Sequence, residues 1–303
     1  MKKNAVRTLH KKEQNTLFNF QDFKKHRYRF LYFVFIFVLV AFLLTAIVPI
    51  LWLLVTSFKT VSEINSTTYH FFPKEFHISK LFDVWQKANF GRYFLNSIIV
   101  GLGASVCAVL FNGLMAYGVN IVKPKGHKVI HIMIMISYMI PAVTGIIPIF
   151  TWLSNLGFTN GYLPYVALML IFGANAFYYV NFRNYFLSIP KSLFEAARMD
   201  GCSDFKIFFK VVLPLSKPII GVVSIFALTA SWSDFLLPYL LLQDSDLYTV
   251  MVEIFQIQST IGNGFTTDEF LMLLVISIIP QLIIFFLFQK QITNSTATSG
   301  IKE

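Results

Sequence analysis

Long apolar runs separated by short polar connections dominate the hydrophobic pattern of the chain. Each run approaches the ~20 apolar residues that an α-helix needs to cross a bilayer, so we expect about six spans. They cover approximately residues 30–55, 95–121, 129–153, 161–180, 219–241 and 270–288. The first run is too long for a signal peptide and lacks a small-residue cleavage site, so we expect it to be retained. The pattern therefore predicts an all-α membrane protein, with a transmembrane domain over 30–290 between polar tails at 1–29 and 291–303.

Proline residues interrupt most of these runs. Each proline frees backbone groups that neighbouring helices or a wet cavity must satisfy. Broken helices often line transport paths, although proline is also generally commoner in membrane helices than in soluble ones, and both interpretations remain open. The prolines in or at the edges of the expected spans are Pro49, Pro141, Pro148, Pro164, Pro218, Pro238 and Pro280.

Composition agrees with a membrane domain. The chain is 56% hydrophobic and 13% charged, whereas soluble domains are about 25% charged. No acidic residue occurs between Asp83 and Glu195, as expected of packed spans, because a carboxylate in hydrocarbon is costly. The net charge is +10, and the Lys and Arg residues lie mostly in short connections and the N-terminal tail. This distribution does not indicate nucleic-acid binding.

Loop charges predict the orientation. Lys and Arg are abundant in the N-terminal tail, in the second-to-third connection and around 183–217, whereas none occurs between Leu241 and Glu269. The positive-inside rule therefore places both termini and the 190–214 loop in the cytoplasm. The first external loop is an exception, since it carries Lys74, Lys80, Lys87 and Arg92.

The 190–214 loop has the pattern of two short helices joined by a tight turn. Ser192 and Glu195 have capping-box spacing, which predicts a helix start. Gly201 is placed to end that helix in a left-handed conformation, Ser203 to cap a second helix, and Pro214 to stop it. The small side chains of Ala196 and Ala197 allow another surface to approach closely. The apolar positions expected on the second helix are Phe205, Phe208, Phe209 and Val212. A plain interfacial linker between two spans is the alternative.

This loop resembles the EAA loop of the membrane subunits of bacterial ATP-driven importers, through Glu195-Ala196-Ala197, Gly201 and Leu213-Pro214. The resemblance implies an ABC importer permease fold of the MetI-like type, in which this loop couples to a separate ATPase. The coupling residues it implies are Glu195, Ala196, Ala197, Asp200, Gly201 and Pro214.

Other stretches are similar to the MalG-like half of carbohydrate permeases of the maltose-importer type. They are Pro49 to Lys59, Phe72-Pro73, Phe90 to Ser97, Met139 to Pro141, Leu156 to Asn160, Trp232 to Pro238 and the ending Thr298 to Glu303. The ending departs from the family pattern at Ser299 and Glu303.

The resemblance implies the partners of a sugar importer in a bacterial cell membrane. They are a MalF-like permease, an ATPase dimer that binds ATP and Mg²⁺, an extracytoplasmic sugar-binding protein, the sugar and membrane lipid. The chain has no phosphate-binding loop, no other catalytic motif and no metal-ligand spacing of Cys107 or Cys202, so we expect neither enzyme activity nor a cofactor of its own. The alternatives are import of another small solute, or an ion-coupled secondary transporter.

Polar residues inside the expected spans are candidates for the translocation path. Asp234 is the one carboxylate that we expect inside a span, which makes it a functional candidate, and Trp232 beside it can offer a ring face to a sugar. The structural alternative, in which Asp234 pairs with a loop donor or water, is favoured. The other candidates are Asn175, Tyr178, Tyr179, Asn181 and Gln281. Each can equally provide a hydrogen bond between helices.

Overall fold

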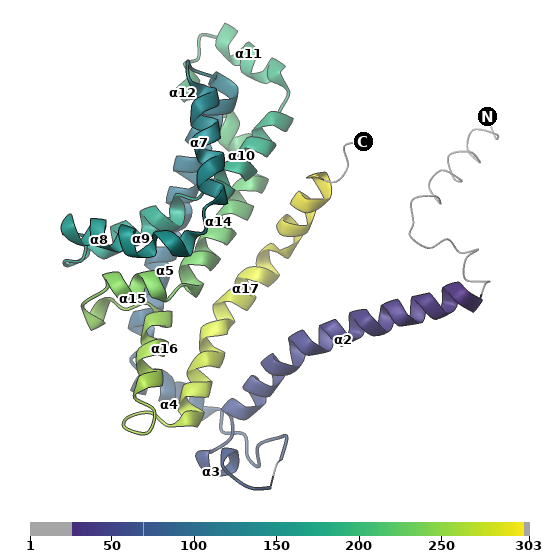
Figure 1. Cartoon of the computed structure of the whole chain (residues 1–303), viewed down its shortest axis with the longest axis vertical. Coiled ribbons are helices and arrows are strands. Elements are labelled where there is room, and N and C mark those ends of the chain that lie inside the picture. The colour runs from purple at the N-terminus through teal and green to yellow at the C-terminus, as the bar shows by residue number, and fades with distance from the viewer. Residues whose placement is uncertain (1–25, 69, 300–303) are drawn as a thin grey trace.

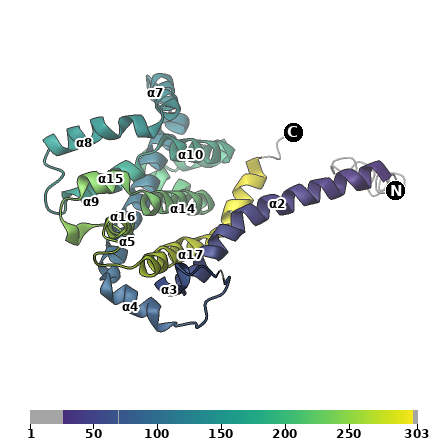
Figure 2. The same ribbon diagram turned by 60° about the horizontal axis from the view of Figure 1, so that its bottom comes forward.

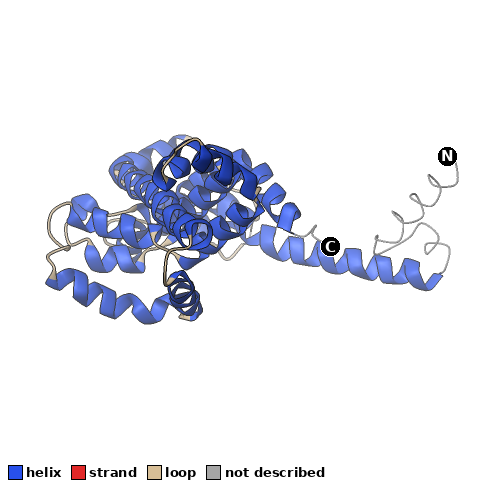
Figure 3. Cartoon of the chain, turned by 90° about the horizontal axis from the view of Figure 1, so that it is seen from above, coloured by secondary structure: helices blue, strands red, loops and turns tan. Residues whose placement is uncertain are grey.

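The computed structural model describes residues 26–68 and 70–299, and these residues form helices joined by short connections (Figures 1 and 3). Within these ranges no strand forms, and a single isolated bridge joins Ile261 to Phe265. Three helices are long and apolar enough to cross a membrane, over Tyr28–Ser57, Phe90–Val122 and Thr267–Gln289. Three bent helix pairs raise the number of candidate spans to six. The predicted all-α membrane fold is confirmed.

The helices follow one another with few long connections. The first half of the chain contains α2 (His26–Ser57), α3 (Val61–Ile64), α4 (Ser79–Lys87), α5 (Phe90–Cys107), η2 (Ala108–Asn112), α6 (Gly113–Tyr117), η3 (Gly118–Val122), α7 (His127–Met139), η4 (Ala142–Gly145) and α8 (Ile146–Asn155). The second half contains α9 (Leu163–Gly173), α10 (Ala176–Ser188), α11 (Lys191–Met199), α12 (Asp204–Ile207), η5 (Phe208–Val212), α13 (Leu213–Leu215), α14 (Lys217–Ser233), α15 (Leu236–Leu241), η6 (Ser245–Leu247), α16 (Val250–Ser259) and α17 (Thr267–Ser299).

The expected third and fourth spans are both broken. The third breaks at Ile140, whose extended backbone is the conformation that a following proline favours. The segment over Ala142–Asn155 is bent by 97° relative to α7. The fourth is the pair α9 and α10, bent by 48°. Because α10 continues to Ser188, this span ends beyond the expected boundary near residue 180, and Arg183 belongs to the helix and not to the following loop.

The expected fifth span over 219–241 is interrupted near its end. Helix α14 ends at Ser233, because Asp234 adopts an extended backbone, and α15 begins after this break at Leu236. At its other end α14 meets the α12–α13 segment at an angle of 84°. The expected C-terminal tail also differs, since α17 continues as a helix to Ser299. The N-terminal residues 1–25 and the final residues 300–303 lie outside the described part of the chain.

Two ends of the bundle are distinguished by short helices lying across them. One end carries α11 and α12, and the opposite end carries α3 and α4 (Figure 1). They are called the α11 end and the α4 end below. A buried cluster at the α11 end includes Tyr179, Phe182, Phe186, Phe194, Ile207 and Phe208. Another at the α4 end includes Val84, Phe90, Trp232, Ile254, Met272 and Leu273. A third joins α5, α9 and α15 through Val100, Leu168, Leu237 and Leu241.

Helix α2 diverges from the rest of the bundle (Figures 1 and 2). None of its most apolar window is buried within the chain, and burial begins only at Val55, where α2 approaches the α4 end. A helix that is apolar all round and exposed must be covered by lipid or by another membrane subunit.

Helices α5 and α9 pack in direct contact at Gly173. A Cβ atom at this position would lie 2.4 Å from the Cβ of Cys107 and 3.1 Å from the carbonyl oxygen of Ala104, so only glycine fits. The carbonyl of Gly173, next to the break between α9 and α10, accepts a 2.7 Å hydrogen bond from Nδ2 of Asn112. The amide of Asn112 therefore satisfies a backbone group near the broken helix, as a membrane interior requires.

Candidate functional site: the loop at the α11 end

Helix α11 begins at Lys191, directly after Pro190. No side chain caps it, so the capping box predicted from Ser192 and Glu195 is wrong. Pro190 has no N–H to satisfy and its φ of −57° is already that of a helix, which allows the helix to start before Ser192. Ser192 consequently lies inside the first turn and not at the N-cap position that a capping box requires.

The turn after α11 is confirmed as a left-handed glycine turn. Gly201 has a φ of 74°. The amide of Gly201 donates to the carbonyl of Arg198 at 3.0 Å, and that of Cys202 donates to the carbonyl of Ala197 at 3.1 Å. This pair of bonds is the Schellman arrangement, which satisfies two carbonyls that the helix end would otherwise leave free. No atom lies within 4 Å of a Cβ built on Gly201, so the demand for glycine comes from the backbone conformation alone.

The second helix of the loop starts as predicted and ends one residue beyond the expected stop. Ser203 caps it by accepting a hydrogen bond from the amide of Lys206. The helical path ends at Leu215, one residue after Pro214, and the chain then bends by 84° into α14. Phe208 and Val212 are buried, whereas Phe205 and Phe209 are exposed. The ring centroids of Phe205 and Phe209 lie 4.8 Å apart. A π-helical segment over 208–212 shifts the register, so the four expected apolar positions do not share one buried face.

The residues of α11, including the predicted coupling residues, divide between two faces. Phe194 and Ala197 are buried against the bundle. Glu195, Ala196 and Asp200 are exposed, and the nearby Met199 is 88% exposed. The small side chain of Ala197 thus lets α11 approach the other helices, whereas Ala196 lies on the surface available to a partner.

One ion pair ties the two helices of the loop together. Nε and Nη2 of Arg198 lie 3.1 and 2.9 Å from Oδ1 of Asp204. These hydrogen bonds raise the pKa of Arg198 above its usual value, so the guanidinium remains charged. Beside α11 lies a hollow of about 190 Å³. Its charged lining residues are Lys123, Lys191, Glu195 and Arg198.

The predicted path residues are mostly engaged within the chain. Trp232 is 3% exposed, its Nε1 donates to the carbonyl of Ser277 at 3.2 Å, and its ring packs edge-on against Phe94. The expectation that Trp232 offers a ring face is therefore wrong. Tyr178 is also buried, whereas Asn175 is exposed and caps α10 by accepting a hydrogen bond from the amide of Phe177.

Asp234 and Gln281 have structural contacts. Oδ1 of Asp234 accepts a 3.1 Å hydrogen bond from the amide of Leu237, which stabilises the start of α15 after the break. Nε2 of Gln281 donates to Oγ of Ser233 at 2.9 Å and links α17 to α14. These contacts agree with the structural alternative for both residues.

The remaining two path candidates also have partners within the chain. The hydroxyl of Tyr179 contacts Asn120 and His131, and Nδ2 of Asn181 donates within its own helix to the carbonyl of Phe177. None of the predicted path residues lines the hollow beside α11.

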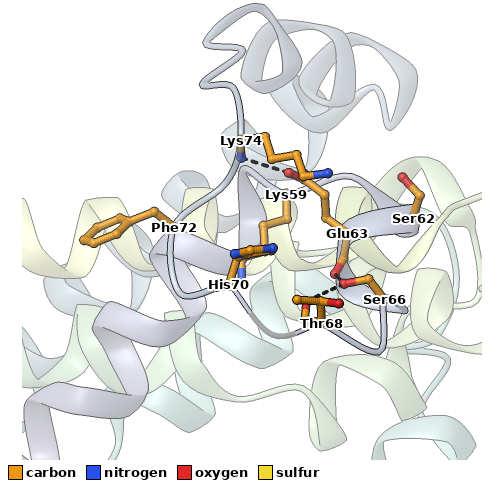
Figure 4. A pocket seen from close by; sticks show the side chains of 8 residues that line it. All are labelled: Lys59, Ser62, Glu63, Ser66, Thr68, His70, Phe72 and Lys74. Carbon is orange, nitrogen blue, oxygen red and sulfur yellow. Dashed lines mark hydrogen bonds between the residues drawn. The ribbon is translucent and has the colours of Figure 1, made fainter.

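The connection between α2 and α5, which we expected to be the first external loop, contains a folded polar pocket that our sequence reasoning missed (Figure 4). Its volume is about 270 Å³. Lys59 is 5% exposed and its Nζ donates to the carbonyl of His70. Glu63 accepts hydrogen bonds from the amides of Thr60 and Lys74, both at 2.8 Å, and these bonds hold its pKa below the usual value. Thr60 and Glu63 form a true capping box, and the T-x-x-E spacing was the available signal.

Basic residues between α2 and the first turn of α5 pair with acidic residues between α15 and the first turn of α17. Nζ of Lys80 lies 2.7 Å from Asp268, and Nζ of Lys87 lies 2.7 Å from Glu269. Arg92 similarly contacts Asp246. The two connections therefore lie at the same end of the bundle. The carboxylates there neutralise three of the four basic residues that were an exception to the positive-inside rule.

Comparison with known proteins finds consistent similarity. The family model described as "Binding-protein-dependent transport system inner membrane component" matches residues 109–297. The chain is 30% identical over 264 residues to the diacetylchitobiose uptake system permease protein NgcG of Streptomyces coelicolor, covering 86% of this chain and 85% of that protein. It is also 30% identical over 286 residues to the galactooligosaccharides transport system permease protein GanQ of Bacillus subtilis, covering 93% and 99%.

A solved structure is similar as well. It is a chain of a bacterial ABC transporter involved in the import of the acidic polysaccharide alginate, with a TM-score of 0.76 and 25% sequence identity. The similarity covers 88% of the present chain and 98% of that chain.

Proposed function

Since the chain belongs to the family of binding-protein-dependent transport system inner membrane components, we propose that it forms one half of the translocation path of an ATP-driven oligosaccharide importer. A member of this family is a transport component and not an enzyme. The observation that carries the proposal is similarity over nearly the whole length to permeases of oligosaccharide systems. The predicted coupling loop lies across one end of the bundle, as such a permease requires.

The substrate class rests on the names of the relatives. They include permeases for diacetylchitobiose, arabinooligosaccharides and galactooligosaccharides. Their common chemistry is a short chain of sugar residues, and we assign the same class to this chain. The polar candidates for the path are largely engaged in contacts within the chain, so the assignment of the class depends on the relatives.

Coupling is assigned to the exposed face of α11. Glu195, Ala196 and Met199 present a carboxylate, a methyl group and a flexible thioether on a helix held by the Gly201 turn. A thioether adapts to irregular surfaces, and the carboxylate can pair with a basic group of the ATPase. ATP and Mg²⁺ would then be bound by a partner ATPase pair, and closure of that pair would move α11.

The other partners follow from the same assignment. A second permease subunit completes the path, and the unpacked apolar surface of α2 is suited to contact with that subunit or with lipid. An extracytoplasmic binding protein delivers the oligosaccharide at the α4 end. In this orientation the α11 end and both termini are cytoplasmic.

An ion-coupled secondary transporter is less well supported. The one carboxylate that we expected inside a span is Asp234, and its Oδ1 is occupied by the amide of Leu237. A proton or ion relay needs a series of exchangeable groups across the membrane, which this carboxylate alone does not supply.

The test is uptake by the complete complex in proteoliposomes. Labelled mono-, di- and tetrasaccharides of β-linked glucosamine, arabinose and galactose are offered with ATP inside the vesicles, and vesicles containing ADP serve as the control. We expect ATP-dependent uptake of at least one oligosaccharide in preference to its monosaccharide. Equal uptake with ADP would contradict ATP coupling, whereas ATP-driven uptake of only non-sugar solutes would contradict the substrate class.

A further inference from the structure

Tyr117 lies where the second span meets the loop at the α11 end. It is the last residue of α6 and its side chain is 3% exposed. Its ring centroid lies 6.3 Å from that of Phe194 on α11 and 5.5 Å from that of Phe208 on η5. One side chain of the second span is therefore packed against both helical segments of the loop, on either side of the Gly201 turn.

The polar end of Tyr117 contacts the ion pair of the loop. Its hydroxyl donates to Oδ1 of Asp204 at 3.4 Å, and the same oxygen accepts both hydrogen bonds from Arg198. α6, α11 and α12 thus share one carboxylate oxygen. A displacement of α11 therefore changes the contacts of Tyr117, both through its ring against Phe194 and through the oxygen that Tyr117 shares with Arg198.

The backbone around Tyr117 is suited to movement as a short segment. π-helical segments over 108–112 and 118–122 lie on either side of α6. Such segments interrupt the regular hydrogen bonding of an α-helix and are frequent at functional positions. Each ends in contact with the fourth span, because Asn112 donates to the carbonyl of Gly173 and Asn120 donates to the hydroxyl of Tyr179.

We propose that Tyr117 is the positioning residue through which the loop moves the second span, so that α6 and the loop shift as one unit. This inference rests on the proposed coupling to an ATPase. The contrasting possibility is a hinge at Gly201 that lets α11 move alone, with Tyr117 serving only as packing. The two possibilities predict different ratios of transport to ATP hydrolysis when Tyr117 is changed. Only movement of α6 together with the loop requires Tyr117 to pass the motion of α11 to the second span.

The experiment compares Tyr117→Phe with Tyr165→Phe in the reconstituted complex. Tyr117→Phe keeps the ring and removes the hydroxyl. Tyr165 is a matched control, since it is also buried and its hydroxyl donates to the carbonyl of Leu247 at 3.0 Å, outside the loop. We expect Tyr117→Phe to lower the number of solute molecules transported per ATP about fivefold. This factor corresponds to the loss of one hydrogen bond from the free energy that couples the loop to the second span. Tyr165→Phe should leave this ratio unchanged.

Asp204→Asn provides an independent second variant, because it weakens the shared acceptor and leaves Tyr117 intact. The ratio is measured only on purified complexes that contain the ATPase, so poor insertion does not affect it. A wild-type ratio in both Tyr117→Phe and Asp204→Asn would overturn the proposal. Failure of the coupling function itself has a different signature, namely a wild-type chain that copurifies with no ATPase.

Discussion

Nζ of Lys80 lies 2.7 Å from Oδ2 of Asp268, and the two side chains are 16% and 12% exposed. The same ammonium donates to the carbonyl oxygens of Ser57 and Lys59, each at 2.7 Å. Lys80 thereby joins the first turn of α4 to the start of α17 and to the residues at the end of α2. Three segments that are far apart in the sequence meet at one positive charge at the α4 end.

Replacing Lys80 should destabilise this end of the bundle. Lys80→Met keeps the apolar stem but leaves a largely buried carboxylate and two carbonyls without their donor. Breaking a buried pair by removing one partner costs about 3 kcal/mol or more, so we expect a clearly lower thermal denaturation midpoint of the purified complex. Lys74→Met is the control, because the side chain of Lys74 is exposed and its contact with Glu63 includes the backbone amide. Equal midpoints for the two variants would show that the Lys80 network contributes little.

Asp234 provides a test of substrate contact against capping. Asn accepts a backbone hydrogen bond at a helix start about as well as Asp, so Asp234→Asn should transport at the wild-type rate under limiting substrate. Asp234→Ala loses the bond to Leu237 and should reduce stability by about 1 kcal/mol. Uptake assays and denaturation midpoints separate the two effects. Loss of uptake by a stable, fully assembled Asp234→Asn complex would instead support direct contact with the sugar.

The orientation can be tested with two single cysteines in a background with Cys107→Ala and Cys202→Ala. Ser203 lies in the loop at the α11 end and Ser259 near the end of α16, and both are exposed. If the positive-inside rule holds, an impermeant thiol reagent added to intact cells should label Ser259→Cys and not Ser203→Cys. Permeabilised cells, in which both positions should react, provide the control. Labelling of Ser203→Cys alone in intact cells would reverse the proposed orientation.

The sequence predicted the approximate positions of the apolar runs and the glycine turn, because both depend on local signals. A run of apolar residues is visible without knowledge of any partner, and the φ of 74° at Gly201 follows from a glycine placed after a helical segment. The breaks were harder to place. Pro141 was recognised as an interruption, but the bend of 97° after α7 depends on how the following helices pack.

The two candidate capping boxes show why a local motif is insufficient. Thr60 to Glu63 and Ser192 to Glu195 have the same spacing, yet only the first forms. Thr60 is itself the residue before the helix, whereas Pro190 starts α11 ahead of Ser192. Burial of Trp232 was also missed, because it results from contacts with Phe94 and Ser277 on distant helices.

The Gly201 turn provides the most direct test of coupling. Gly201→Val places a β-branched residue at positive φ, which costs about 1–2 kcal/mol, so the turn should distort and α11 should lose its orientation. Gly201→Asn is the matched control, since Asn tolerates the left-handed conformation and the position has no neighbouring atom within 4 Å of an added Cβ. We expect the Val variant to insert in the membrane but to lose the ATPase on purification, or to retain it without sugar-stimulated hydrolysis, while the Asn variant keeps both. A plain linker would tolerate either residue, so normal sugar-stimulated hydrolysis and transport by Gly201→Val would argue against a coupling role for this loop.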